Sequence, residues 1–209
     1  MTKLIIFLAI TAIVSYLLGG LNGAIISSVN FFKKDVRDFG SGNAGLTNFT
    51  RTFGSHGVLI VVLTDVLKTI IAVLFGGWLL GLLGYPMLGK LFAGFCAMLG
   101  HVYPVYYNFK GGKATLCAGA MVWAIDWRVG IICWAIFLTV VIFTKYVSLG
   151  SIVSVLALPI GIWAFGHSGL EALLALFCAM LLIFAHRENI KRLLAGTESK
   201  LPLGSKKSQ

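Results

Sequence analysis

Three polar clusters interrupt an otherwise apolar sequence, and the residue types in each suit the binding of a phosphate group. The first runs from Gly40 to Arg51. Its glycines allow successive backbone N–H groups to converge on an anion, and an arginine guanidinium fits phosphate with paired bonds. The candidate residues are Gly40, Ser41, Gly42, Asn43, Thr47, Asn48 and Arg51. Glycine, asparagine and serine also serve ordinary turns, so a solvated basic loop remains the alternative interpretation.

The second cluster reads Phe109-Lys110-Gly111-Gly112-Lys113, with His101 and Pro104 upstream. It directly precedes an apolar segment, so its N–H groups and the ammonium of Lys113 would lie at a helix N-terminus, which favours an anion. The alternative is a turn whose lysines only set the membrane topology.

The third cluster, residues 186–192, ends the last apolar segment. His186 and Asn189 are three residues apart and share a face if the helix continues. A basic collar at the membrane boundary would explain Lys191 and Arg192, but not the histidine and asparagine.

One further pair of charged residues, Asp65 and Lys68, lies three residues apart within an apolar segment. Charges inside a membrane are costly and mark either function or a structural ion pair.

The composition indicates which elements must position these clusters. Hydrophobic residues make up 58% of the 209 residues and charged residues only 11%, against about 25% in soluble domains. Such a chain cannot cover a soluble surface, so its exterior must face membrane lipids. The formal net charge of +10 falls in short loops and a tail, so we expect no nucleic-acid partner. The four cysteines lack the spacing of metal ligands, and we expect no metal and no cofactor.

Apolar segments cover residues 4–28, 55–80, 88–107, 114–126, 129–145, 149–166 and 169–186. A helix needs about 20 residues to cross the hydrocarbon core. We therefore predict an all-α polytopic membrane helix bundle with seven transmembrane helices. The segment 114–126 is short: either it begins deep within the protein, or it forms a non-spanning hairpin with the next segment. Five spanning helices is accordingly the alternative count.

Lysine and arginine are distributed unevenly between the two sides of this arrangement. Thirteen fall on one side: Lys33, Lys34, Arg37, Arg51, Lys110, Lys113, Lys145, Arg187, Lys191, Arg192, Lys200, Lys206 and Lys207. Lys3, Lys90 and Arg128 fall on the other. The positive-inside rule then predicts the N-terminus outside, the C-terminus inside and all three clusters cytoplasmic. We expect one membrane domain over residues 1–198 and a polar, basic cytoplasmic tail over residues 199–209.

In this order and on one side of the membrane, the three clusters resemble the bacterial acyl-phosphate:glycerol-3-phosphate acyltransferase family of integral membrane enzymes. The first matches its Gly-Ser-Gly-Asn-x-Gly-x-Thr-Asn-x-x-Arg signature, and the second its glycine–lysine loop. The third matches a His-x-x-Asn-Ile-x-Arg-Leu pattern, with Gly196 and Glu198 beyond it. The resemblance runs from about Ser15 to Glu198 and includes an Asp–Lys pair at Asp65 and Lys68.

The resemblance implies transfer of a fatty acyl group from acyl phosphate to glycerol-3-phosphate, giving lysophosphatidic acid and phosphate. It implies catalytic or phosphate-binding roles for Ser41 and Arg51, and catalytic roles for His186 and Asn189. It places glycerol-3-phosphate at Gly111, Gly112 and Lys113, and makes Glu198 structural. It also implies a multi-pass protein of the bacterial plasma (inner) membrane with a cytoplasmic active site. Protein partners are not indicated.

The chain departs from the family pattern after Lys113. The family continues Gly-Gly-Lys-Gly-Val-Ala-Thr, whereas this chain has Ala114 in place of the last glycine and Cys117 in place of the threonine. A positive φ at position 114 and a hydroxyl at position 117 are therefore not expected from this sequence.

The histidines give independent support for an acyl phosphate donor. Many membrane acyltransferases place an aspartate five residues after a histidine, and none of His56, His101, His167 and His186 has one. Acyl phosphate is a mixed anhydride with a good leaving group, so it depends less on such a base. The proton of the attacking hydroxyl would go either to His186 or to a donor phosphate oxygen.

A transporter or channel for a small anionic solute is the main alternative function. It would need polar groups near the midplane with access from both faces. The clustering on one face favours an enzyme instead.

Overall fold

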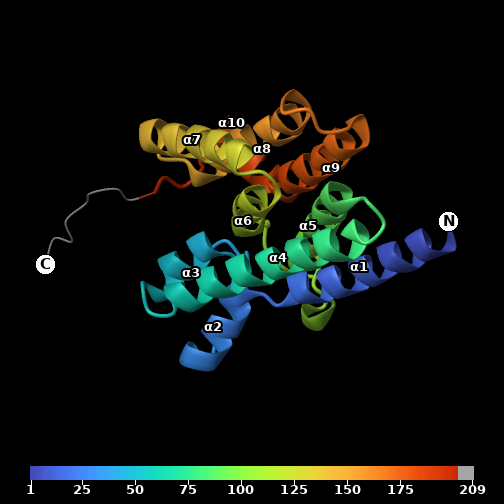
Figure 1. The fold of residues 1–209 in the computed structure, drawn as a ribbon. Coiled ribbons are helices and arrows are strands. Elements are labelled where there is room, and N and C mark those ends of the chain that lie inside the picture. Colours follow the sequence, from blue (N-terminus) through green and yellow to red (C-terminus); the bar gives the residue numbers. More distant parts are fainter. Residues whose placement is uncertain (202–209) are drawn as a thin grey trace, which may run out of the picture.

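The computed structural model describes residues 1–201, and within them every regular element is helical (Figure 1). In chain order the α-helices are α1 (Thr2–Gly20), α2 (Gly23–Phe32), α3 (Leu46–Phe53), α4 (Val58–Gly81), α5 (Pro86–Val102), α6 (Thr115–Ile125), α7 (Trp127–Thr144), α8 (Val147–Ala164), α9 (Gly169–Ala185) and α10 (Arg187–Leu194). Two 3-10 turns, η1 (Val36–Asp38) and η2 (Val105–Tyr107), lie in the loops. The all-α prediction is confirmed for the described residues.

The first apolar segment is broken, whereas the sequence predicted one continuous helix over residues 4–28. α1 ends at Gly20, and α2 begins at Gly23 after two intervening residues. Asn22 caps the new helix, because its side-chain Oδ1 accepts the N–H of Ile25 at 3.0 Å. A buried asparagine satisfies its amide more easily at a helix start than within a helix, where the backbone N–H groups are already used.

The helices form two layers that meet at α6 and where α5 packs against α9. α1, α4 and α5 pack against one another, α8 packs against both α7 and α9, and α6 contacts both α4 and α7 (Figure 1). α1 and α5 approach closely at Gly19, where an added Cβ would collide with the backbone of Ala97. Small residues allow such contacts between membrane helices.

Within residues 1–201, five helices are long and apolar enough to cross a membrane, counting Thr2–Phe32 as one. The pair α9 and α10, bent by 59°, would make a sixth. α6 has only 11 residues, or about 16 Å at 1.5 Å per residue. Length and composition therefore support a multi-pass membrane protein with five or six long spans, and the count of seven is not confirmed.

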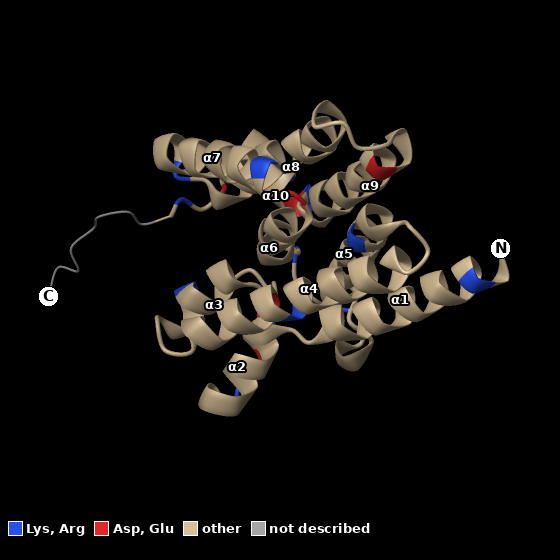
Figure 2. Cartoon of the chain, viewed as in Figure 1, with Lys and Arg blue, Asp and Glu red and all other residues tan. Residues whose placement is uncertain are grey.

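The surface also fits a lipid environment. Large apolar side chains stand exposed along the outer faces of α1, α4, α7 and α8. Figure 2 shows that most of the helical ribbon carries no charged residue.

The end of the described chain is attached to the bundle. The N–H of Leu201 donates to the carbonyl of Lys145 at 2.7 Å, so residues 199–201 lie against the α7–α8 turn. The remainder of the predicted tail, residues 202–209, lies outside the described residues.

Candidate active site

The first cluster is folded around Asn48, a buried residue near the start of α3. Its Nδ2 donates to the carbonyls of Val36 and Phe39, both at 3.0 Å. Its Oδ1 accepts the N–H of Ser41 at 2.9 Å. Its amide group therefore holds the chain's own loop, and a contact of Asn48 with substrate stays a prediction. The Ser41 side chain is left exposed at the tip.

The glycine–lysine loop is anchored to the last turn of α5. The N–H groups of Gly111 and Gly112 donate to the carbonyls of Val102 and His101 at 3.1 and 3.0 Å. We expected these two N–H groups to face a phosphate, but they are bonded within the protein. The glycines instead permit close packing, since a Cβ at Gly112 would collide with the His101 ring and lie 2.5 Å from the carbonyl oxygen of Ala44.

The close approach of Gly112 to Ala44 joins the first two clusters. Ala44 belongs to the first loop, and its carbonyl also accepts the Asn22 side-chain amide at 3.0 Å. Arg37 adds a second link, because its Nη1 donates to the carbonyls of Tyr107 and Lys110 at 2.9 and 3.0 Å. The two loops are thus fixed relative to each other by the break after α1 and by one guanidinium.

The third cluster meets the second through Lys113, whose ammonium donates to Oδ1 of Asn189. Asn189 in turn donates to Oε1 of Glu198 at 2.7 Å. Ser148 donates to the same oxygen at 2.8 Å, and Nε of Arg192 donates to Oε2 at 2.7 Å. Glu198 therefore ties the end of the chain to α8 and α10 and orients Asn189 toward Lys113.

Burial and the neighbouring charges shift the pKa values of Lys113 and Glu198. Burial lowers the pKa of Lys113 to about 8, and the nearby positive charges of Arg192 and Arg51 act in the same direction while Glu198 opposes them. Burial opposes ionisation of Glu198, but its hydrogen bonds from Asn189, Ser148 and Arg192 hold its pKa below the ordinary value. Lys113 therefore lies in the field of two other cations, Arg192 and Arg51, and of one carboxylate, Glu198, and the excess positive charge suits a phosphate.

His186 lies buried at the junction of α9 and α10. Its Nδ1 lies 2.9 Å from the carbonyl of Leu182, which requires the proton to be on Nδ1 and leaves the Nε2 lone pair free. A neutral Nε2 can accept a hydrogen bond from a substrate hydroxyl.

Asp65 and Lys68 belong to a separate buried network beneath the loops. The Lys68 ammonium lies 2.8 Å from Oδ1 of Asp65, 2.7 Å from the carbonyl oxygen of Leu21 and 2.9 Å from Nδ1 of His101. Oδ1 of Asp65 also accepts the N–H of Gly23 at 3.2 Å. The pair closes the break between α1 and α2 and reaches the residue that anchors Gly112.

The structure therefore brings Lys113, Asn189, Glu198 and Arg192 into direct contact, with His186 and Arg51 nearby. Thr47 and Arg51 are exposed on α3. Sequence reasoning missed Asn22, Arg37 and Ser148. Asn22 could have been recognised as a polar residue between Gly20 and Gly23 inside an apolar segment. The sequence around Arg37 and Ser148 contains no comparable feature.

Ala114 adopts φ +57°, the left-handed conformation that a glycine would adopt with less strain. Because an alanine Cβ is strained there by roughly 1 kcal/mol, we expect Ala114→Gly to raise the free energy of unfolding by about that amount. Thermal unfolding in detergent micelles would measure the change. Ala118→Gly, within α6, is the matched control and is expected to destabilise the protein. A decrease in stability for Ala114→Gly would contradict the assignment of strain.

Comparison with known proteins places this geometry in a family. The glycerol-3-phosphate acyltransferase family model matches residues 9–196. A glycerol-3-phosphate acyltransferase from Thermoanaerobacter pseudethanolicus is 43% identical over 93% of this chain and 96% of its own length. Another, from Clostridioides difficile, is 40% identical over 95% and 96%.

A solved structure has the same fold. The crystal structure of PlsY (YgiH), an integral membrane glycerol 3-phosphate acyltransferase in its glycerol 3-phosphate form, has a TM-score of 0.82 at 32% identity. The match covers 93% of this chain and 95% of that one. The family model, the relatives and the solved structure agree, and this chain belongs to the glycerol-3-phosphate acyltransferase family.

Proposed function

We propose that this chain transfers a fatty acyl group from acyl phosphate to glycerol-3-phosphate and releases lysophosphatidic acid and phosphate. The observation that supports this most directly is the contact between Lys113 and Asn189, which unites two clusters that are distant in the sequence. Around it, Arg51, Lys113 and Arg192 supply more positive charge than Glu198 neutralises. Such a site is suited to gathering two phosphorylated substrates, which is the main requirement of this reaction.

In this proposal Lys113 and Arg51 bind the phosphate of glycerol-3-phosphate, and Ser41 and Asn43 contact the phosphate of the donor. A glycerol hydroxyl attacks the acyl carbonyl carbon, an ester C–O bond forms, and the C–O bond to the donor phosphate breaks. The electron pair leaves on the phosphate, which also takes the hydroxyl proton. His186, whose Nδ1 is bonded to the carbonyl of Leu182, orients the hydroxyl through Nε2. Asn48, Gly111, Gly112 and Glu198 act as positioning residues.

The transporter alternative is less well supported. A substrate path would need polar groups accessible from both ends of the bundle. The two charged groups buried within α4, Asp65 and Lys68, are instead bonded to each other and to the backbone.

We further propose seven crossings, with α6 as the short one. The start of α6 follows Lys113, which contacts α10, whereas its end lies beside Asp126, which contacts His167 before α9. Because α9 separates these two contacts, α6 passes from one end of the bundle toward the other with its first turn sunk into the protein. An odd count puts the two termini on opposite sides, and the excess of Lys and Arg on one side favours the N-terminus outside and the C-terminus inside. The active site would then lie at the cytoplasmic face of a bacterial inner membrane, with residues 1–198 as one domain.

This topology predicts the labelling of single cysteines in a background without Cys96, Cys117, Cys133 and Cys178. We expect Ser41→Cys and Lys191→Cys to react with an impermeant maleimide only after the membrane is opened, since both lie on the positively charged side. Gly84→Cys, in the α4–α5 turn, is the control and is expected to react in intact cells. Labelling of positions 41 and 191 from outside would overturn the orientation.

The choice of donor is tested by turnover of purified protein with glycerol-3-phosphate. We expect lysophosphatidic acid from acyl phosphate, and little or none from the matched acyl-CoA or acyl carrier protein thioester. A thiolate is a poorer leaving group than phosphate. A thioester donor would therefore need a general base or a covalent nucleophile, which this site does not supply. Efficient turnover of a thioester together with no turnover of acyl phosphate would refute the proposed reaction.

A further inference from the structure

The end of the bundle opposite the active site carries its own group of polar residues. His167, just before α9, approaches Asp126 at 3.2 Å, and His186 follows the last residue of α9. The 17 residues of α9 span about 25 Å at 1.5 Å per residue. The turn between α6 and α7 is therefore separated from the catalytic cluster by about one helix length.

Exposed aromatic side chains gather at this end. They come from the ends of α4, α6 and α8 and from the starts of α5 and α7: Trp78, Tyr85, Trp123, Trp127 and Trp163. Tryptophan and tyrosine concentrate at the depth of lipid headgroups because their rings are apolar and their N–H or O–H groups are polar. This end of the bundle therefore lies at a membrane–water interface.

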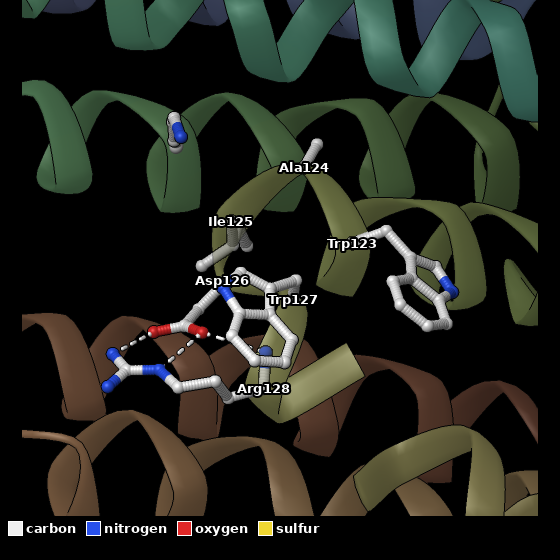
Figure 3. A pocket seen from close by; sticks show the side chains of 7 residues that line it. Trp123, Ala124, Ile125, Asp126, Trp127 and Arg128 are labelled. Carbon is white, nitrogen blue, oxygen red and sulfur yellow. Dashed lines mark hydrogen bonds and ion pairs between the residues drawn. The ribbon is translucent and has the colours of Figure 1, made fainter. Parts of the chain in front are cut away.

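A shallow, open cavity of about 440 Å³ lies at this end, between the first turns of α5 and the α6–α7 turn (Figure 3). Lys90, Trp123, Trp127 and Arg128 line it. Figure 3 shows the ring of Trp127 beside the bonded side chains of Asp126 and Arg128. The volume is within the range of roughly 300–1,000 Å³ that is typical of small-molecule sites.

The cavity carries an excess of positive charge. Asp126 accepts Nε and Nη2 of Arg128 at 3.0 and 2.7 Å, so this carboxylate offsets one cation and leaves the Nη1 group available. The guanidinium is held in place over the Phe165 ring, 4.3 Å from its centroid. Lys90 makes no ion pair or side-chain hydrogen bond within residues 1–201, and its stem packs against Gly77.

We propose that this cavity binds the phosphate of an anionic phospholipid headgroup, with Lys90 and Nη1 of Arg128 as donors. The rings of Trp123 and Trp127 would contact the glycerol and the upper acyl chains. The exposed tryptophan and tyrosine side chains at this end favour a lipid over a soluble phosphate, because they place the cavity at the depth where lipid phosphates lie. Such a lipid is not a substrate, since the cavity is remote from Lys113, and this inference does not depend on the proposed reaction.

Lipid titration followed by native mass spectrometry tests the proposal. We expect phosphatidylglycerol to bind detergent-solubilised protein, and Lys90→Gln to weaken that binding roughly tenfold by removing a charge-assisted contact. Lys3→Gln removes the same charge outside the cavity and should leave binding unchanged. Acyl transfer in micelles should be unaffected by either change. Equal lipid binding by the two variants would overturn the proposal.

Two further measurements identify the ligand source and control for folding. Inorganic phosphate at millimolar concentration should not displace phosphatidylglycerol; if it displaces the lipid and its own binding is lost in Lys90→Gln, the cavity binds free phosphate and the lipid assignment is wrong. Lys90→Arg keeps the charge and should retain lipid binding. Loss of binding in Lys90→Arg, with an unchanged melting temperature, would also contradict the proposed contact.

Discussion

Replacing Lys113 with alanine is expected to lower kcat/KM for glycerol-3-phosphate at least tenfold while the protein stays folded. The ammonium is partly buried, faces the excess positive charge of the site and orients Asn189. A charge-assisted contact to phosphate contributes about 1.5–3 kcal/mol, and each 1.4 kcal/mol corresponds to about a factor of ten. Arg51→Ala is expected to have a similar effect. Steady-state kinetics with glycerol-3-phosphate as the varied substrate would measure both.

Lys110→Ala is the matched control, because it removes the same charge from an exposed position three residues earlier in the same loop. We expect its kcat/KM to remain within about twofold of the unmodified enzyme, as is usual for exposed charges. Equal losses for Lys110→Ala and Lys113→Ala would mean that general electrostatic attraction, and not a specific contact, explains the effect. Normal kinetics for both Lys113→Ala and Arg51→Ala would rule out a shared phosphate site.

The pH profile gives a second readout of the same contact. Since burial lowers the pKa of Lys113 to about 8, its ammonium form decreases as the pH rises through 8, and kcat/KM should fall over the same range. Arginine stays protonated throughout this range. Lys113→Arg should therefore show a flatter alkaline limb, whatever its activity at pH 7.

The membrane class and the three-part site were predictable from the sequence because both depend on residue type. A chain with 58% hydrophobic residues has to expose apolar surface, and no arrangement of the fold alters that. The clusters could be assigned to one face because short basic loops alternate with apolar segments. The family comparisons confirm the family that the motifs indicated, whereas the shared face and the roles of the site residues stay predictions.

The atomic roles within the loops were not predictable from the sequence. The sequence of a glycine-rich loop is the same whether its N–H groups face a ligand or are bonded within the protein. At Gly111 and Gly112 the N–H groups are bonded to α5. The Asn48 side chain was expected to contact a substrate, and in the structure it holds its own loop. Arg37 and Ser148 reach partners 73 and 50 residues away. Such contacts depend on tertiary packing, which leaves no mark at either residue.

The departure at Ala114 shows a related limit. A positive φ was not expected at a residue with a Cβ, yet the backbone adopts φ +57° there. The neighbouring constraints explain this, since Gly112 is fixed to His101 and Lys113 is fixed to Asn189. The packing of the loop on both sides determines the conformation between them, at a cost in local strain.

Asp65→Ala is expected to have the largest effect on stability, a loss of about 3–5 kcal/mol in the free energy of unfolding. The side chains of Asp65 and Lys68 are only 2% and 3% exposed. Removing the carboxylate leaves a buried ammonium facing only the Leu21 carbonyl and the His101 ring, and it frees the N–H of Gly23. Thermal or denaturant unfolding in micelles at constant pH would measure the loss.

The double variant Asp65→Ala/Lys68→Ala separates an ion pair from simple loss of packing. If the penalty of Asp65→Ala comes from the unpaired charge, removing Lys68 as well should recover part of the lost stability, giving a coupling energy of about 0.5–3 kcal/mol. Thr64→Ala, one position earlier on α4 and without a hydrogen-bonded carboxylate, is the control and should be nearly neutral. If the double variant instead loses the sum of both single penalties, the two side chains stabilise the break after α1 independently. The contact at 2.8 Å would then contribute nothing as a pair.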